Sequence, residues 1–113
     1  MFSRIFNKRM LKSYRKVFTH EKMMNLYAEF KTLTNDQLKR ASKTKDKEEL
    51  RFIFHSLKSS SLVFGMVKFS KCNAQLEQKV LDGKELLAKE IEECTMLYKR
   101  SLEKVDAYLR GPR

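Results

Sequence analysis

The stretch FHSLKSSSLVFGM, residues 54–66, decides how this chain folds and which of its side chains is chemically unusual. At helical spacing it continues one mainly apolar stripe, made of Leu50, Phe54, Leu57, Ser61 and Phe64. His55 follows Phe54 by one residue, so it lies at the edge of that stripe or beyond it. The stretch therefore predicts a core-facing helix that presents a histidine near its exposed side.

The neighbours of His55 along this helix are mostly polar or positively charged. Arg51 lies one turn before it, Lys58 and Ser59 lie one turn after it, and Leu62 lies a further turn on. Two cations beside an imidazole could neutralise a phosphoryl group carried on the ring. On the residues alone, this interpretation competes with the commoner one, in which a lone surface histidine has no special role.

The composition of the 113 residues favours helices throughout the chain. Three glycines and one proline leave little material for the turns of a sheet, while Lys, Glu, Leu, Met and Ala are plentiful. Hydrophobic residues make up 42% of the chain, which is enough to build a core. A chain of this length is most simply one domain, so we expect a single all-α domain.

The net charge of +11 indicates an acidic partner, which could be nucleic acid, an anionic membrane or an acidic protein surface. No apolar run approaches the roughly 20 residues that a membrane-spanning helix needs. Cys72 and Cys94 are far apart in the sequence and form no CxxC pair. In the absence of a secretory signal, we expect reduced thiols in a cytoplasmic protein.

Local signals predict where the helices begin and end. Thr19 is a candidate N-cap for a helix that runs to about Lys43. Asp46 followed by Glu49 resembles a capping box that opens the next helix, which should end near Gly65.

Two further helices are expected over residues 67–81 and about 85–109, separated by an Asp-Gly turn. Residues 19–110 should then form an antiparallel four-helix bundle. The side chains expected to face its interior are Met23, Leu26, Tyr27, Phe30, Leu33, Leu38, Ala41, Leu50, Ile53, Phe54, Leu57, Ser61, Phe64, Phe69, Cys72, Leu76, Val80, Leu87, Ile91, Cys94, Tyr98, Leu102, Val105 and Leu109.

Residues 1–18 are predicted to form an additional, basic amphipathic helix. Its apolar residues at helical spacing are Phe2, Ile5, Phe6, Met10, Tyr14, Val17 and Phe18, and its cations are Arg4, Lys8, Arg9, Lys12, Arg15 and Lys16. We expect the apolar stripe to pack on the bundle while the basic face is solvated. The alternative is a helix that contacts a membrane surface or an acidic partner.

The residues around His55 resemble the signature of histidine-containing phosphotransfer (HPt) domains. That signature reads roughly H-x-L-K-G-S-S, then a glycine, then an apolar residue four positions beyond it, then L-E. The residues that match it here are His55, Leu57, Lys58, Ser60, Ser61, Gly65, Phe69, Leu76 and Glu77. The departure is Ser59, where the family usually has a glycine that leaves room for a partner's active site.

This resemblance implies a phosphocarrier of a multistep two-component phosphorelay, with no kinase activity of its own. His55 would accept a phosphoryl group from one receiver-domain aspartate and donate it to another, and Lys58 would stabilise the phosphohistidine. Arg51, Ser59 and Leu62 would contact the partner. The implied partners are the receiver domains of a hybrid sensor kinase and of a response regulator.

Further expectations concern cofactors, metals, oligomeric state and other partners. It should need no cofactor or metal of its own, because the receiver domain supplies the Mg²⁺. We expect it to be a monomer that contacts neither nucleic acid nor a membrane.

Two alternatives stay open on the sequence. A degenerate HPt-like module could bind receiver or kinase domains without phosphotransfer; Ser59 favours this alternative, whereas the intact His55 and Lys58 favour a working carrier. The other alternative is nucleic-acid binding by basic helices, for which the sequence offers no recognition motif.

Overall fold

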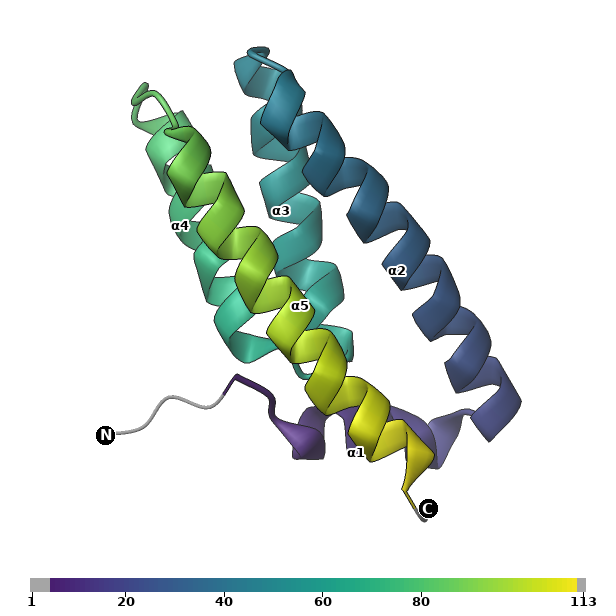
Figure 1. The fold of residues 1–113 in the computed structure, drawn as a ribbon. Coiled ribbons are helices and arrows are strands. Elements are labelled where there is room, and N and C mark those ends of the chain that lie inside the picture. The colour runs from purple at the N-terminus through teal and green to yellow at the C-terminus, as the bar shows by residue number, and fades with distance from the viewer. Residues whose placement is uncertain (1–4, 112–113) are drawn as a thin grey trace.

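The computed structural model describes residues 5–111, and every regular element in that range is a helix. The five helices are α1 (Lys8–Val17), α2 (His20–Lys43), α3 (Lys47–Val63), α4 (Val67–Leu81) and α5 (Ala88–Arg110) (Figure 1). The all-α prediction is confirmed.

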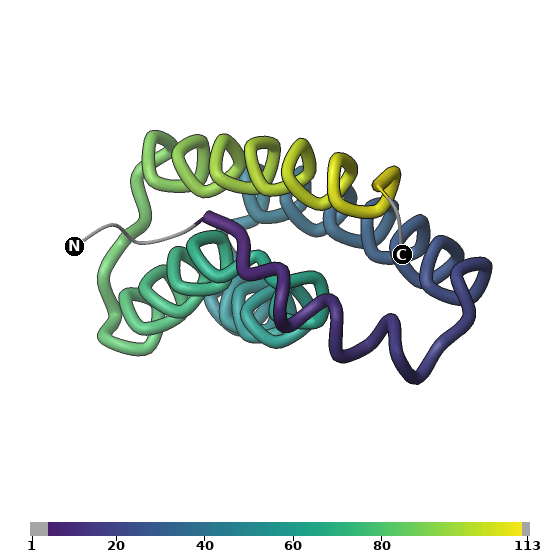
Figure 2. Tube along the Cα trace, turned by 90° about the horizontal axis from the view of Figure 1, so that it is seen from below, coloured from purple at the N-terminus to yellow at the C-terminus, as the bar shows by residue number. Residues whose placement is uncertain are grey.

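Helices α2 to α5 alternate in direction and form the bundle, while α1 lies across one of its ends. Helices α3 and α4 make the most extensive contact in the bundle. Helices α2 and α3 are close together at the loop that joins them, and the start of α2 lies further from α3 (Figure 1). Seen from below, α1 passes in front of the end of α3 and then connects to the start of α2 (Figure 2).

Side-chain caps fix the starts of α2 and α3. The Thr19 hydroxyl accepts a hydrogen bond from the backbone N–H of Lys22, as its N-cap position predicts. The Asp46 carboxylate accepts from the first-turn N–H groups of Glu48 and Glu49. The predicted capping box is only half formed, because the Glu49 carboxylate instead accepts from Arg40, 2.7 Å away on α2.

Gly65 both ends α3 and anchors the N-terminal segment. Its φ of +72° lies in the left-handed region, which glycine adopts without strain. Its carbonyl accepts from the Asn7 N–H at 2.8 Å, and a Cβ at this position would lie 2.2 Å from the Asn7 carbonyl oxygen. No larger residue fits here unless the chain before α1 moves.

Aromatic rings fill the middle of the core. Phe30 and Phe64 have ring centroids 4.9 Å apart, and Phe69 and Tyr98 have centroids 5.1 Å apart. Such tilted pairs stabilise a core beyond their buried area. The buried hydrophobic residues are Leu11, Met23, Tyr27, Phe30, Leu38, Ala41, Leu50, Ile53, Phe54, Leu57, Phe64, Met66, Phe69, Leu76, Val80, Ile91, Cys94, Tyr98, Val105 and Leu109. Most of the side chains predicted to face inward are therefore in the core.

The predicted inward stripe of the N-terminal helix is only partly correct, because Phe6 and Phe18 pack against the core but other members of the stripe do not. The helix begins at Lys8, where the Asn7 side chain caps it by accepting from the Arg9 N–H, and its buried residues are Leu11 and Arg15. Two side chains expected to face inward point outward, since Tyr14 is 39% and Val17 is 77% exposed. Phe2, which belonged to the predicted stripe, lies outside the described residues.

Two further predictions about burial fail. Leu33 is 57% exposed, and the neighbouring Thr34 is buried in its place. Leu87 is 62% exposed, because α5 begins after it at Ala88 and leaves Leu87 as the N-cap. Leu26, Cys72 and Leu102 are partly buried and pack against the margin of the core.

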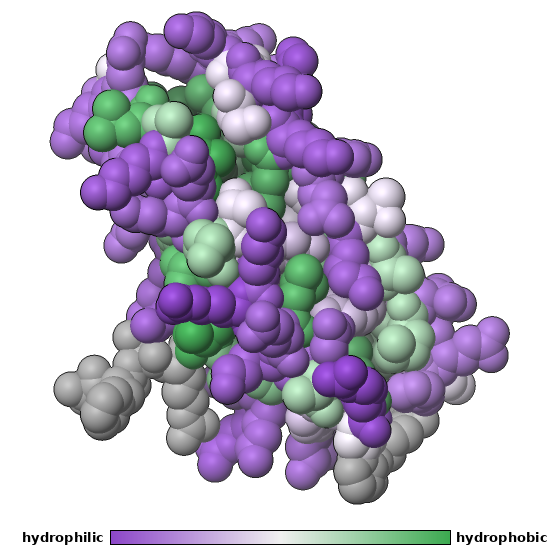
Figure 3. All heavy atoms as spheres, in the orientation of Figure 1, coloured by the Kyte–Doolittle hydropathy of each residue, from purple (hydrophilic) through white to green (hydrophobic). Residues whose placement is uncertain are grey.

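The exposed sides of the helices are mainly hydrophilic, as expected for an amphipathic bundle. On the face with α5 to the front, polar side chains dominate, and hydrophobic atoms are visible between them (Figure 3). Within the described residues, no helix is both long and apolar enough to span a bilayer.

Candidate functional site

His55 projects from the side of α3 that faces the solvent next to α4. Its side chain is 60% exposed, although the preceding residue, Phe54, is completely buried. The ring Nδ1 lies 2.8 Å from Oε2 of Glu77 on α4. A carboxylate only accepts hydrogen bonds, so Nδ1 carries the proton and the neutral ring has its lone pair on Nε2. The hydrogen bond at Nδ1 therefore orients the ring and leaves Nε2 without a partner among the described residues.

Glu77 joins His55 to Lys58. Its second oxygen, Oε1, accepts from the Lys58 ammonium at 2.9 Å, and the Glu77 side chain is only 10% exposed. Burial of the carboxylate raises its pKa, but the hydrogen bonds and charges of Lys58 and His55 act in the opposite direction and hold the pKa below its ordinary value. Glu77 is therefore an ionised, nearly buried anchor for both side chains.

Small buried side chains bring α3 and α4 close enough for this arrangement. Ser70 on α4 donates to the Lys58 carbonyl oxygen at 2.7 Å, and Ser61 on α3 donates to the same oxygen at 3.3 Å. Ser61 is fully buried and Ser70 is 5% exposed. The chain reverses at Gly65, and His55 and Glu77 are at similar numbers of residues before and after this turn. The two side chains therefore lie next to each other on adjacent helices.

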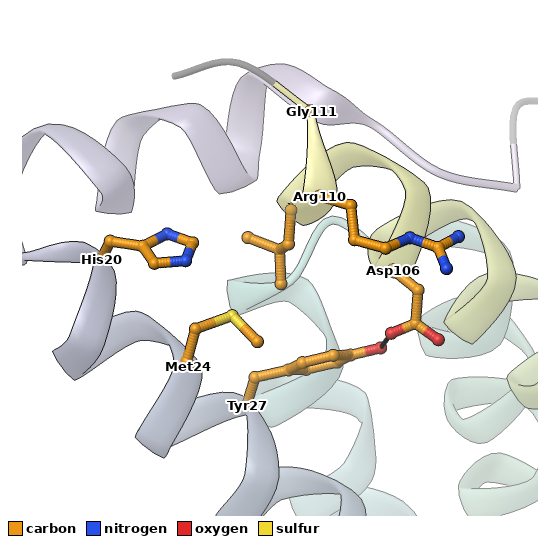
Figure 4. A pocket seen from close by; sticks show the side chains of 7 residues that line it. His20, Met24, Tyr27, Asp106, Arg110 and Gly111 are labelled. Atoms are coloured by element: carbon orange, nitrogen blue, oxygen red, sulfur yellow. Dashed lines mark hydrogen bonds between the residues drawn. The ribbon is translucent and has the colours of Figure 1, made fainter.

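Three pockets in the described part of the chain lie away from His55. Two are between α2 and α5, and a third is near the loops at the far end of the bundle; His55 lines none of the three. In the pocket of Figure 4, the Tyr27 hydroxyl donates to the Asp106 carboxylate at 2.6 Å and so ties α2 to α5. An exposed imidazole on a helix surface suits a macromolecular partner better than a small enclosed substrate.

Comparison with protein-family models gives a match to the Hpt domain over residues 23–108. The chain belongs to the Hpt domain family. Hpt domains are phosphocarriers that work with kinases and receiver domains, so the protein is involved in histidine phosphotransfer in a two-component phosphorelay. Searches of curated proteins and of solved structures give no match.

The Hpt fold places the sequence-predicted site residues in two groups. His55 and Lys58 are brought together through Glu77. Arg51 and Ser59 are exposed one turn before and one turn after His55, where a partner that approaches the ring would meet them. Leu62 is only partly exposed and lies furthest along α3. In the described part of the chain, Arg51 has no ion-pair partner.

Glu77 is the site residue that the sequence interpretation missed. It stands in the matched Leu76-Glu77 pair of the Hpt signature, but no role was assigned to it. The sequence placed only cations beside His55, whereas the charged group that contacts its ring is this carboxylate. Phe52, which is 66% exposed, is a large apolar side chain one turn before the histidine.

The Hpt site has no arrangement that resembles a metal centre. Within residues 5–111, no three His, Cys, Asp or Glu side chains are grouped so that they could hold a metal ion. The Glu77 carboxylate is occupied by Lys58 and His55, so it is not free to act as a ligand.

Proposed function

We propose that this Hpt domain carries a phosphoryl group between receiver-domain aspartates, with His55 as the residue that is phosphorylated. The observation that supports this most directly is the hydrogen bond from the exposed His55 ring to the nearly buried Glu77 carboxylate. It orients a nucleophilic nitrogen toward solvent on a helix whose opposite side is fixed in the core. Phosphoryl transfer depends mainly on such positioning and on charge stabilisation.

In the accepting step, the Nε2 lone pair of His55 attacks the phosphorus of an aspartyl phosphate on the receiver. The N–P bond forms as the bond from phosphorus to the aspartate oxygen breaks, and the aspartate leaves as a carboxylate. Nδ1 keeps its proton, so the ring becomes cationic, and the Glu77 carboxylate stabilises that charge. The reverse sequence of bonds delivers the phosphoryl group to the aspartate of the next receiver.

Lys58 offsets part of the charge that the phosphoryl group brings. Its ammonium is held by Glu77 one helical turn from His55, and its side chain is 34% exposed. A cation held in place loses less conformational entropy when the phosphoryl group arrives than a freely rotating one does. The Mg²⁺ and the in-line geometry belong to the receiver's active site.

The surface beside His55 is suited to a docked receiver. Arg51 supplies charge, Ser59 is small enough to leave clearance, and Phe52 offers an apolar contact. The gathered acidic groups of a receiver's active site complement the strongly positive chain, which should speed encounter at low salt. Leu62 would contribute at the margin of this surface.

The test is transfer of a labelled phosphoryl group from a receiver domain that has been phosphorylated with a small acyl phosphate. The wild-type protein should become labelled, and His55→Gln should not, while helicity and melting temperature stay nearly unchanged because the ring is mostly exposed. Labelling of His55→Gln would place the phosphoryl group elsewhere. If wild type binds receivers but takes no label from any of them, the non-transferring alternative is correct.

A further inference from the structure

Helix α1 presents four cations that nothing in the described chain neutralises. Lys8, Arg9, Lys12 and Lys16 are all exposed. Each acidic side chain of the sequence lies within residues 5–111, and none of them forms an ion pair with these four. The first turn of α1 contains no acid. A compact helix with four unpaired positive charges attracts an anionic surface.

The same helix exposes apolar side chains because its packing uses other residues. Leu11 is completely buried, and the Arg15 guanidinium lies 5.0 Å from the centre of the Tyr108 ring. This choice of buried side leaves Val17 77% exposed and Tyr14 39% exposed. The Tyr14 ring is parallel to that of Phe18, with centroids 6.5 Å apart. We expected no membrane contact because the apolar stripe of this helix was predicted to pack on the bundle. Tyr14 and Val17, which belong to that stripe, are exposed instead.

We define the α1 face as the exposed residues Lys8, Arg9, Lys12, Tyr14, Lys16 and Val17. The start of α1 is tied to the bundle by the hydrogen bond from the Asn7 N–H to the Gly65 carbonyl, and its last turn is closed by the bond from the Phe18 N–H to the Tyr14 carbonyl within the helix. Helix α1 lies across one end of the bundle, so these exposed residues are at that end (Figures 1 and 2).

Other basic residues lie at the same end of the bundle. His20 and Arg110 line the pocket between the start of α2 and the end of α5, where Figure 4 shows both side chains. His55 is on the flank of the bundle, about 12 Å along α3 from the last residue of that helix at 1.5 Å per residue. A flat surface against this end would therefore leave His55 in water.

We propose that the α1 face binds the surface of an anionic lipid bilayer. Lysine and arginine side chains contact acidic headgroups, while the Val17 side chain and the Tyr14 ring enter the boundary between headgroups and acyl chains. A phenol is suited to that boundary, since its ring is apolar and its hydroxyl is polar. Duplex nucleic acid would use the cations but would leave Val17 exposed. The Hpt match begins at residue 23, so α1 is not part of the shared domain, and this inference does not depend on the phosphotransfer activity of His55.

Sedimentation with vesicles tests the electrostatic part of the proposal. The full-length protein should bind phosphatidylcholine vesicles that contain about 30% phosphatidylserine, and should not bind vesicles of phosphatidylcholine alone. Replacing Lys8, Arg9, Lys12 and Lys16 by glutamine should lower the partition coefficient by about two orders of magnitude, because each cation near an anionic surface contributes a several-fold gain. Raising the salt to about 0.5 M should have a similar effect in wild type.

The control removes the same charge from the opposite end of the bundle. Lys43, Lys45, Lys47 and Lys84 are exposed there and form no ion pair with a described residue. Their replacement by glutamine should change vesicle binding much less than the α1 replacement does. Equal losses in the two variants would mean that net charge alone causes the attraction, and would overturn the proposal. So would an α1 variant that binds vesicles normally but has lost its affinity for a receiver domain or for duplex DNA.

A fluorescence experiment tests the insertion of the apolar residues. The chain contains no tryptophan, so Val17→Trp introduces a single reporter at a position that is 77% exposed. Its emission should shift to the blue when phosphatidylserine vesicles are added. Leu81→Trp, at a 54% exposed position on the end of α4, should show no such shift. Emission at position 17 that stays at its aqueous wavelength while the protein sediments with vesicles would overturn insertion.

Discussion

The Nδ1 of His55 and the Oε2 of Glu77 are 2.8 Å apart, and they join the middle of α3 to α4 across the most extensive helix contact of the bundle. One partner is mostly exposed and the other almost buried. The core therefore fixes the carboxylate, and the carboxylate fixes the ring. This difference in burial allows a surface histidine to have one tautomer and one orientation.

Removing the Glu77 carboxylate should impair transfer without removing the phosphorylated residue. Glu77→Ala removes the hydrogen bonds to both His55 and Lys58. The loss of the one that orients the ring, of about 1.5–3 kcal/mol, should lower the rate of phosphoryl acceptance roughly ten- to hundredfold. Glu77→Gln retains an oxygen acceptor for Nδ1 and should be affected less. Single-turnover transfer from a phosphorylated receiver measures both rates.

The tautomer of the His55 ring distinguishes a role of Glu77 in orienting the ring from a purely structural role. Nitrogen NMR of the His55 ring should show mainly the Nδ1–H tautomer in wild type and a mixture in Glu77→Ala. An unchanged tautomer together with a slowed rate would mean that Glu77 acts through something other than the ring.

Lys58 should matter for the lifetime or the formation of the phosphohistidine. Lys58→Ala removes a charge-assisted contact of about 1.5–3 kcal/mol, so the affected rate should change roughly ten- to hundredfold. Lys71→Ala is the matched control, because Lys71 is an exposed cation on α4 that has no ion-pair partner among the described residues. The decay of labelled protein and the rate of labelling give the two quantities. If both stay at wild-type values, Lys58 has no part in the mechanism.

Stability should depend on pH through Glu77. Its pKa is lower in the folded protein than the ordinary carboxyl value of about 4.3. Its ionisation therefore stabilises the fold at pH values above about 4.3, and that contribution is lost as the pH falls through the lower folded pKa. Urea unfolding should show wild type losing more stability than Glu77→Gln on acidification through this range. Parallel curves for the two proteins would contradict the shift.

The sequence predicted the starts of α2 and α3 correctly, because an N-cap depends only on neighbouring residues in the chain. Thr19 and Asp46 accept from N–H groups in the first turn of their own helices, so their roles depend on a few neighbouring residues. The role of Glu77 depends instead on the register between α3 and α4, which local signals leave open. Its partners, His55 and Lys58, are on another helix and become neighbours only after the chain has turned at Gly65.

The buried side of α1 was not predictable for a different reason. A helix of 10 residues offers two stripes to the bundle, one with Leu11 and Arg15 and one with Met10, Tyr14 and Val17. Hydropathy favours the second stripe, because the first includes Arg15. The structure uses the first, since the Arg15 side chain packs over the Tyr108 ring of α5 and so keeps a favourable contact for its charge.

The orientation of α1 can be tested by two truncations on opposite sides of the helix. Leu11→Ala should lower the free energy of unfolding by about 2–5 kcal/mol, because it empties a completely buried position. Val17→Ala should change it by no more than about 0.5 kcal/mol, since the side chain is 77% exposed. The stripe predicted from the sequence, in which Val17 faces the bundle, would make Val17→Ala the more damaging of the two. Chemical denaturation of both variants distinguishes these orientations, and a tolerated Leu11→Ala would mean that α1 does not pack on the bundle as described.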